Sequence, residues 1–156
     1  ILLSGFGNFS GGLVGETMVK IADAKLHYSF LQAFMLGVLC NILVCLAVWL
    51  CYAANSLIDK VVAIIFPVSA FIAAGFEHSI ANMYLIPAGL YLKVINPELY
   101  ASLPVEPPLF TFGNFLTQNL IPVTLGNMVG GILFVGTAYD LIYRSSLSNM
   151  TQNDHP

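Results

Sequence analysis

The chain has 156 residues, of which 58% are apolar and only 8% carry charge, and its formal net charge is −3 at neutral pH. Soluble domains carry about 25% charged residues, so this composition argues against a soluble globular protein. The slight negative charge also argues against nucleic-acid binding by bulk electrostatics. Two runs, Leu26–Ile58 and Pro107–Tyr139, lack Asp, Glu, Lys and Arg entirely. Each exceeds the roughly 18 apolar residues that indicate a membrane span, so the sequence predicts an all-α protein embedded in a lipid bilayer.

The first apolar segment begins at Ile1 with neither an initiator Met nor a basic stretch before it. Because a signal peptide needs a basic region ahead of its apolar core, we expect residues 1–24 to be the end of a transmembrane helix whose beginning lies upstream. Three apolar segments follow, with a proline-rich surface loop before the last and a polar tail after it. We expect a helix over about 29–54, a broken helix over about 61–95, the loop over 96–109, a helix over about 110–143 and the tail over 145–156.

The segment 61–95 is too long for a simple span. Its 35 residues would measure roughly 52 Å as one helix, against about 30 Å of hydrocarbon in a bilayer. Gly75 and the pair Glu77–His78 divide it into two short apolar halves. Short apolar segments interrupted by Gly and polar residues are typical of a discontinuous helix with polar groups at mid-membrane. We predict a break within two or three residues of Glu77.

A short repeat links the first and last segments, because Gly7–Gly12 and Gly126–Gly131 both follow the pattern G-N-x-x-G-G. The small-xxx-small spacing within the pattern lets helices pack closely. Together with the broken helix, it indicates two copies of a three-helix unit in opposite orientations. Residues 25–144 would then be the second repeat, and only the last helix of the first repeat would be present.

Glu77 and His78 are the strongest candidates for a functional site. Ionisable residues deep in a membrane are costly and mark functional sites by default, although a structural pair satisfied by neighbouring helices is the alternative. Lys25 lies just before the second apolar segment. It either extends to the membrane surface, as isolated lysines often do, or folds inward to pair with Glu77. For the second case we predict charged atoms within about 8 Å, roughly a Debye length.

Further candidates lie in the neighbouring segments. Asn41 and Asn127 lie at mid-membrane depth, where each either faces the pore or makes an ordinary interhelical hydrogen bond. Val44, one turn after Asn41, is a candidate for an apolar conduit. Phe71 precedes the break and is a candidate constriction, with packing as the alternative. We find no phosphate-binding loop, metal-ligand cluster or nucleophile–base pair, so the sequence predicts no catalytic residue, no metal and no cofactor.

Three stretches of the sequence carry a resemblance to a known family: C-N-I-L-V-C-L-A-V-W at 40–49, G-F-E-H-S-I-A-N-M at 75–83 and N-L-I-P-V-T-L-G-N at 119–127. With Lys25, they resemble the formate/nitrite transporter family over nearly the whole chain. The second stretch is highly specific. The third is more similar to the formate channels than to the nitrite or hydrosulfide branches.

The resemblance implies an aquaporin-like fold of six spans in two inverted repeats, assembled as a homopentamer with one pore in each protomer. The broken helix of the first repeat, which completes both constrictions, has no counterpart in this sequence. The site residues that the resemblance implies are a central pore histidine, its electrostatic support, two pore-side amides, an apolar pore wall and a constriction: His78, Glu77 with Lys25, Asn41 with Asn127, Val44 and Phe71.

The resemblance further implies a channel for a small monovalent anion, most directly formate, in the bacterial cytoplasmic (inner) membrane, with protons as a second partner. A histidine with an ordinary pKa near 6.5 is suited either to donate a proton to formate or to hydrogen-bond it, and the sequence leaves both open. A nitrite or hydrosulfide channel of the same family is the alternative. An intramembrane acid/base enzyme built on Glu77–His78 is a remote one, since no nucleophile or metal ligands accompany the pair.

Overall fold

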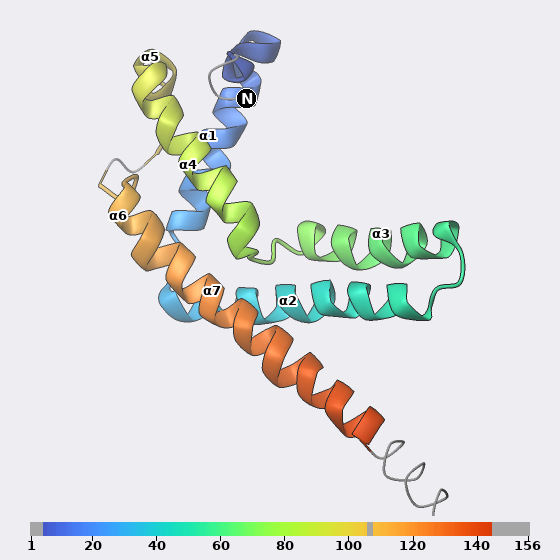
Figure 1. Ribbon diagram of the computed structural model, residues 1–156. Coiled ribbons are helices and arrows are strands. Elements are labelled where there is room, and N and C mark those ends of the chain that lie inside the picture. Colours follow the sequence, from blue (N-terminus) through green and yellow to red (C-terminus); the bar gives the residue numbers. More distant parts are fainter. Residues whose placement is uncertain (1–4, 106–107, 145–156) are drawn as a thin grey trace, which may run out of the picture.

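The computed structural model describes residues 5–105 and 108–144, and every regular element in those ranges is helical (Figure 1). A 3₁₀ segment, η2 (Phe6–Gly12), precedes the helices α1 (Leu13–Leu26), α2 (Phe30–Ala53), α3 (Leu57–Ala73), α4 (Ser79–Ile95) and α5 (Pro97–Ala101). One long helix, Phe112–Arg144, follows the loop. It consists of α6 (Phe112–Asn114), the π-helical stretch η3 (Phe115–Leu120), α7 (Ile121–Met128), a second π-helical stretch η4 (Val129–Gly136) and an α-helical end at 137–144.

Polar caps determine where α2 and α3 begin. At the start of α2, the hydroxyl of Ser29 accepts from the amide of Gln32, and the Gln32 side chain accepts from the amide of Ser29. Ser56 and Asp59 form the same reciprocal pair at the start of α3. Such capping boxes satisfy two backbone amides that would otherwise lack partners, so the polar turn between the two apolar helices is fixed by its own sequence.

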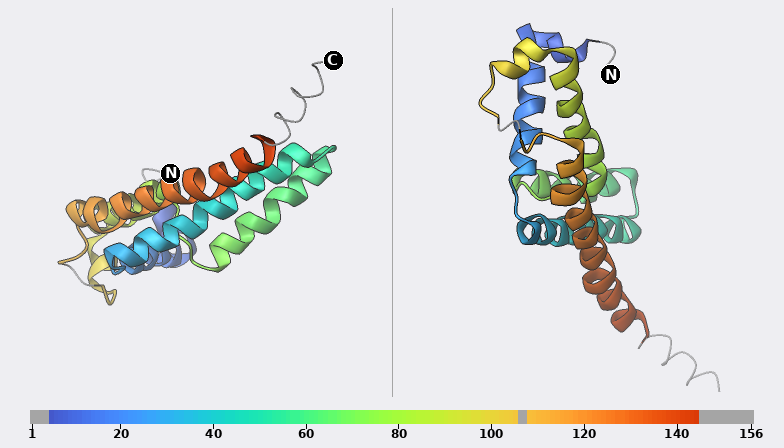
Figure 2. Two further views of the ribbon diagram at one scale, coloured as in Figure 1. Left: turned by 90° about the horizontal axis from the view of Figure 1, so that it is seen from below. Right: turned by 90° about the vertical axis from the view of Figure 1, so that its left-hand side faces the viewer.

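The helices form two antiparallel pairs that run crosswise to each other (Figures 1 and 2). α1 lies beside α4, α2 lies beside α3, and the long helix crosses α2 obliquely. Glycine permits this last crossing, because a Cβ at Gly37 would lie 2.7 Å from the carbonyl oxygen of Val123. Gly126 and Gly130 likewise face the backbone of α2. The long helix is therefore held directly against α2.

The buried core is small and leaves much of the apolar surface uncovered. On α3, Leu57, Ile58 and Phe66 are 79%, 74% and 71% exposed. In the part of the chain that the structure describes, two helices, α2 and Phe112–Arg144, are long and apolar enough to cross a membrane. The core lies between α1, α4 and the start of the long helix and consists of Val19, Ala22, Leu26, Ile86, Leu92, Phe110 and Phe115.

The predicted discontinuous helix is present, as α3 ends at Ala73 and α4 begins at Ser79. The two G-N-x-x-G-G stretches, in contrast, differ in conformation. The first lies in η2, where Gly11 (φ 67°) and Gly12 (φ 93°) are left-handed, whereas the second continues the long helix. The shared letters alone therefore do not identify equivalent helices.

The expected end of a transmembrane helix at 1–24 contains η2 and most of α1, and its first four residues lie outside the described ranges. The expected surface loop 96–109 includes the short helix α5. The expected polar tail, 145–156, lies outside the described residues.

Candidate functional site

The site is built around the break between α3 and α4. The chain leaves α3 through Gly75, whose φ of 68° is strained for any residue with a side chain. The amide of Phe76 still reaches back to the carbonyl of Phe71 at 2.9 Å, after which the amide of Glu77 donates to the carbonyl of Leu36 on α2 at 3.3 Å. The break is thus an ordered turn tied to a neighbouring helix.

The Glu77 side chain is fully buried and its carboxylate receives hydrogen bonds from three residues. Lys25 Nζ lies 2.5 Å from Oε1, while Asn82 Nδ2 and Asn119 Nδ2 lie 2.6 Å and 3.0 Å from Oε2. The prediction that Lys25 reaches Glu77 is confirmed by this distance. All three partners donate, so they stabilise an ionised carboxylate where an unpaired charge would be prohibitive.

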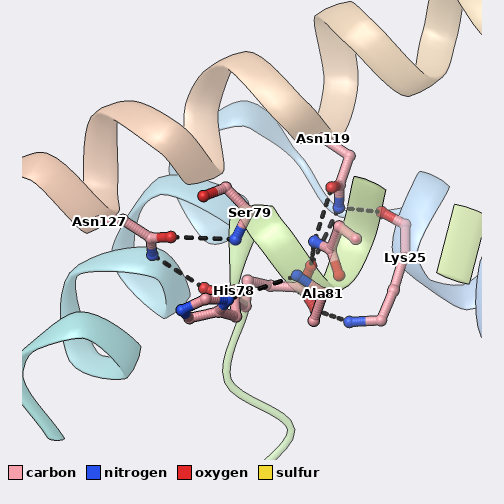
Figure 3. Close-up of polar contacts among 8 residues, drawn as sticks. Lys25, His78, Ser79, Ala81, Asn119 and Asn127 are labelled. Carbon is pink, nitrogen blue, oxygen red and sulfur yellow. Dashed lines mark hydrogen bonds and ion pairs between the residues drawn. The ribbon is translucent and has the colours of Figure 1, made fainter. Parts of the chain in front are cut away.

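Asn82 and Asn119 are the residues that the sequence interpretation missed. Asn82 also donates to Asn119 Oδ1 at 2.8 Å, and Asn119 donates to the backbone carbonyl of Lys25 at 3.1 Å. The sequence contains one indication for each residue: Asn82 follows His78 by one helical turn, and Asn119 is a polar residue within an apolar span. Together they link α1, α4 and the long helix around one carboxylate (Figure 3).

Asn127 fixes the backbone of the break itself. Its Oδ1 accepts from the amide of Ser79 at 3.0 Å, and its Nδ2 donates to the carbonyls of Glu77 at 3.0 Å and Gly37 at 2.8 Å. Asn41 Nδ2 in turn donates to the backbone carbonyl of Asn127 at 2.6 Å. Both asparagines therefore make interhelical hydrogen bonds, which was one of the two interpretations open to each.

His78 contacts both half-helices. It is the N-cap residue of α4, where its Nδ1 accepts from the amide of Ala81 at 3.4 Å. Its ring also stacks on Phe71 of α3, with centroids 6.1 Å apart and planes 24° apart. Figure 3 shows His78 and Ala81 at the start of α4, where the chain segment from α3 enters the helix.

A cavity of about 370 Å³ adjoins the break. Four of the predicted site residues line it, namely Lys25, Phe71, Glu77 and His78. Asn41, Val44 and Asn127 are not among the lining residues, and Val44 is half-buried along α2. Within 5–105 and 108–144, no group of three His, Cys, Asp or Glu side chains is placed to hold a metal ion.

Comparison with known proteins identifies the family. Residues 1–141 match the family described as Formate/nitrite transporter. The chain belongs to the formate/nitrite transporter family. Among the relatives of this formate/nitrite transporter chain, the formate channel FocA of Escherichia coli (strain K12) is 44% identical over 157 residues, which cover 98% of this chain and 53% of FocA. The formate channel FocB of the same strain is 39% identical and covers 92% of this chain and 52% of FocB.

Two solved structures have the same fold as this formate/nitrite transporter chain. A pentameric formate channel with formate bound has a TM-score of 0.81 at 48% identity, covering 91% of this chain and 57% of that one. An FNT family ion channel has a TM-score of 0.68 at 32% identity, covering 88% and 50%. The chain thus spans about half the length of these relatives. The relatives are channels and transporters, and the family is one of integral membrane proteins.

Proposed function

We propose that the protein containing this chain is a membrane channel for small monovalent anions, most directly formate, with proton-linked passage at His78. The observation that supports it best is the cavity at the helix break, which His78 lines beside the Lys25–Glu77 ion pair. The named formate channels among the relatives support formate over nitrite and hydrosulfide. The pentameric relative supports a homopentamer. We place the channel in the bacterial cytoplasmic (inner) membrane.

The anion would enter a cavity whose fixed charges cancel. Glu77 neutralises Lys25 at 2.5 Å, so no free ammonium would trap the anion. The remaining attraction comes from dipoles, because α4 begins at the cavity wall and a helix N-terminus carries about half a positive charge. A site that attracts an anion weakly also lets it leave, as conduction requires.

Proton transfer would then allow passage through apolar regions. A bare anion is costly in an apolar constriction, whereas neutral formic acid is far less so. In this mechanism His78 supplies the proton, Phe71 forms a constriction next to it, and Val44 remains a predicted part of an apolar pore wall. Asn41 and Asn127 hold the helices around the break.

Flux measurements on the complete protein in proteoliposomes test the proposal. We expect formate to cross without chemical change and faster than nitrite or hydrosulfide. His78→Asn should assemble but lose the pH dependence of flux in at least one direction, while His27→Asn, at the exposed end of α1, should leave the pH profile unchanged. Absence of flux, or conversion of formate to a product, would overturn the channel assignment. Preference for nitrite or hydrosulfide would overturn the substrate.

A further inference from the structure

The His78 ring is held on both of its sides. On α4, Nδ1 accepts a hydrogen bond from the amide of Ala81 at 3.4 Å, which caps the first turn of the helix. On α3, Phe71 stacks against the ring at 6.1 Å. One imidazole therefore joins the two half-helices across the break.

The Ala81 contact determines which nitrogen carries the proton. A ring nitrogen that accepts a hydrogen bond has no proton, so the proton of the neutral ring is on Nε2. A second proton must go to Nδ1. Since Nδ1–H and the Ala81 amide are both donors, protonation and capping exclude each other in this ring position. The positive end of the α4 dipole disfavours an imidazolium there as well.

The groups around His78 do not reverse this preference. The titratable side chains that line the same cavity are Lys25 and Tyr28, from α1 and the turn after it, and Glu77. Lys25 and Glu77 form an ion pair. α2 adds the buried thiol of Cys40. The side chains that the long helix presents at the break are the amides of Asn119 and Asn127, which do not titrate.

We propose that Phe71 and the Ala81 amide are positioning elements that hold His78 as a neutral Nε2–H donor, and that uptake of a second proton requires Nδ1 to release the Ala81 amide. This inference rests on the proposed proton-linked function of the same histidine. Neutral His78 then offers the anion a hydrogen bond from Nε2. Proton donation is open only to a ring whose Nδ1 has left the Ala81 amide, so protonation and loss of this cap are one event.

The proton balance of a cycle follows. The neutral ring takes a proton at Nδ1 from a hydronium ion, which leaves as water, and becomes imidazolium. The carboxylate then takes the proton from Nε2 and becomes the neutral acid. The ring left behind carries its proton on Nδ1 and still cannot accept from Ala81. Capping returns only after water moves that proton to Nε2. Each transfer therefore includes a period in which the Ala81 amide of α4 is uncapped.

Solid-state ¹⁵N NMR of the complete protein in lipid bilayers tests the proposal. The His78 ring signals are those missing from His78→Asn, and the Ala81 amide is compared with that of Ala88, in the buried middle of α4. We expect a neutral ring with its proton on Nε2. We also expect an Ala81 amide that shifts with the same midpoint as ring protonation, while Ala88 stays constant. A neutral ring protonated on Nδ1, a silent Ala81 amide, or a ring that never takes a second proton would overturn the inference.

A matched pair of variants on α3 tests the role of Phe71. Phe71→Leu removes the ring that stacks on His78 and holds its Nδ1 against the Ala81 amide. Because Nδ1 can then leave the amide more easily, the protonation midpoint of His78 should move to higher pH. Phe66→Leu changes an exposed residue of the same helix and should leave the midpoint in place. Equal midpoints in both variants would overturn the positioning role of Phe71. Formate flux in the same preparation separates the two proposals: a coupled titration without flux overturns the channel function alone, and flux without coupling overturns this inference alone.

Discussion

Separating the ion pair at the break should be among the most costly single changes in this chain. Glu77 is buried to 1% exposure at its side chain, and Lys25 to 16%. Removing one partner of a buried pair leaves an uncompensated charge and costs about 3–5 kcal/mol. We therefore expect Lys25→Met to destabilise the protein by that amount, because the amides of Asn82 and Asn119 donate to the carboxylate but do not neutralise it.

Glu77→Gln should cost less than Lys25→Met. The ammonium of Lys25 retains some access to water. The new amide nitrogen, however, must face either Lys25 or the two asparagine donors, and an unsatisfied buried donor costs about 1–3 kcal/mol. The double variant Lys25→Met/Glu77→Gln removes both charges, so its cost should fall below the sum of the singles by an interaction energy of about 0.5–3 kcal/mol.

The measurement is denaturant-induced unfolding of the complete protein in detergent micelles. α1 offers a matched control in the Glu16–Lys20 pair, which has the same 2.5 Å contact but side chains that are 33% and 53% exposed. Lys20→Met should cost no more than about 0.5 kcal/mol, as is usual for exposed helix pairs. Equal costs for Lys20→Met and Lys25→Met, or additive costs in the double variant, would refute the argument from burial.

Three further changes separate hydrogen bonding from packing in the same unfolding assay. Asn127→Leu should lower the free energy of unfolding by on the order of 3 kcal/mol, because three backbone groups lose their hydrogen-bond partner and each unsatisfied buried group costs about 1–3 kcal/mol. A loss under about 1 kcal/mol would contradict this. Gly37→Ala should cost about 1–3 kcal/mol by overpacking against Val123, whereas Gly113→Ala, with open space around it, should not. Tyr100→Phe should be neutral or stabilising, because its buried hydroxyl has no hydrogen-bond partner among residues 5–105 and 108–144.

The break and its ion pair could be predicted because their causes are local in the sequence. A carboxylate within an apolar segment needs a counter-charge whatever the fold, and Gly75 beside it supplies a left-handed residue. Few cations were available, and Lys25 lies next to a long uncharged run. These arguments depend on composition and spacing, and not on how the helices pack.

The amide cluster could not be predicted, because it depends on the register of the long helix. Asn119 and Asn127 are eight residues apart, which on an ideal α-helix places them about 80° apart. Yet both reach Glu77, one at the carboxylate and the other at the backbone carbonyl. Asn119 lies in the π-helical stretch η3, and such stretches shift the faces that follow and are frequent at functional sites. No pattern in the sequence marked η3.

The expectation for α2 shows the limit of helical periodicity. Asn41 and Val44 share a face by spacing, and both were candidates for the same pathway. The structure turns Asn41 toward the long helix, where its amide donates to the Asn127 carbonyl and lies close to Gly131. Periodicity groups residues on one face correctly, but only tertiary packing decides whether that face meets another helix or a cavity.

The three asparagines bound to Glu77 determine the net charge next to the cavity of the proposed channel. Asn82, Asn119 and Asn127 bind Glu77 through amides, which add no charge to a low-dielectric region. If lysines or arginines replaced them, the cavity would hold a standing positive charge, and an entering anion would bind too tightly to be released. A single Lys25 balanced by Glu77, with amides for the remaining hydrogen bonds, leaves helix α4 and His78 as the groups that meet the anion. The break is thus held by hydrogen bonds and is locally neutral, and the ring of His78 is the part left to respond to a proton.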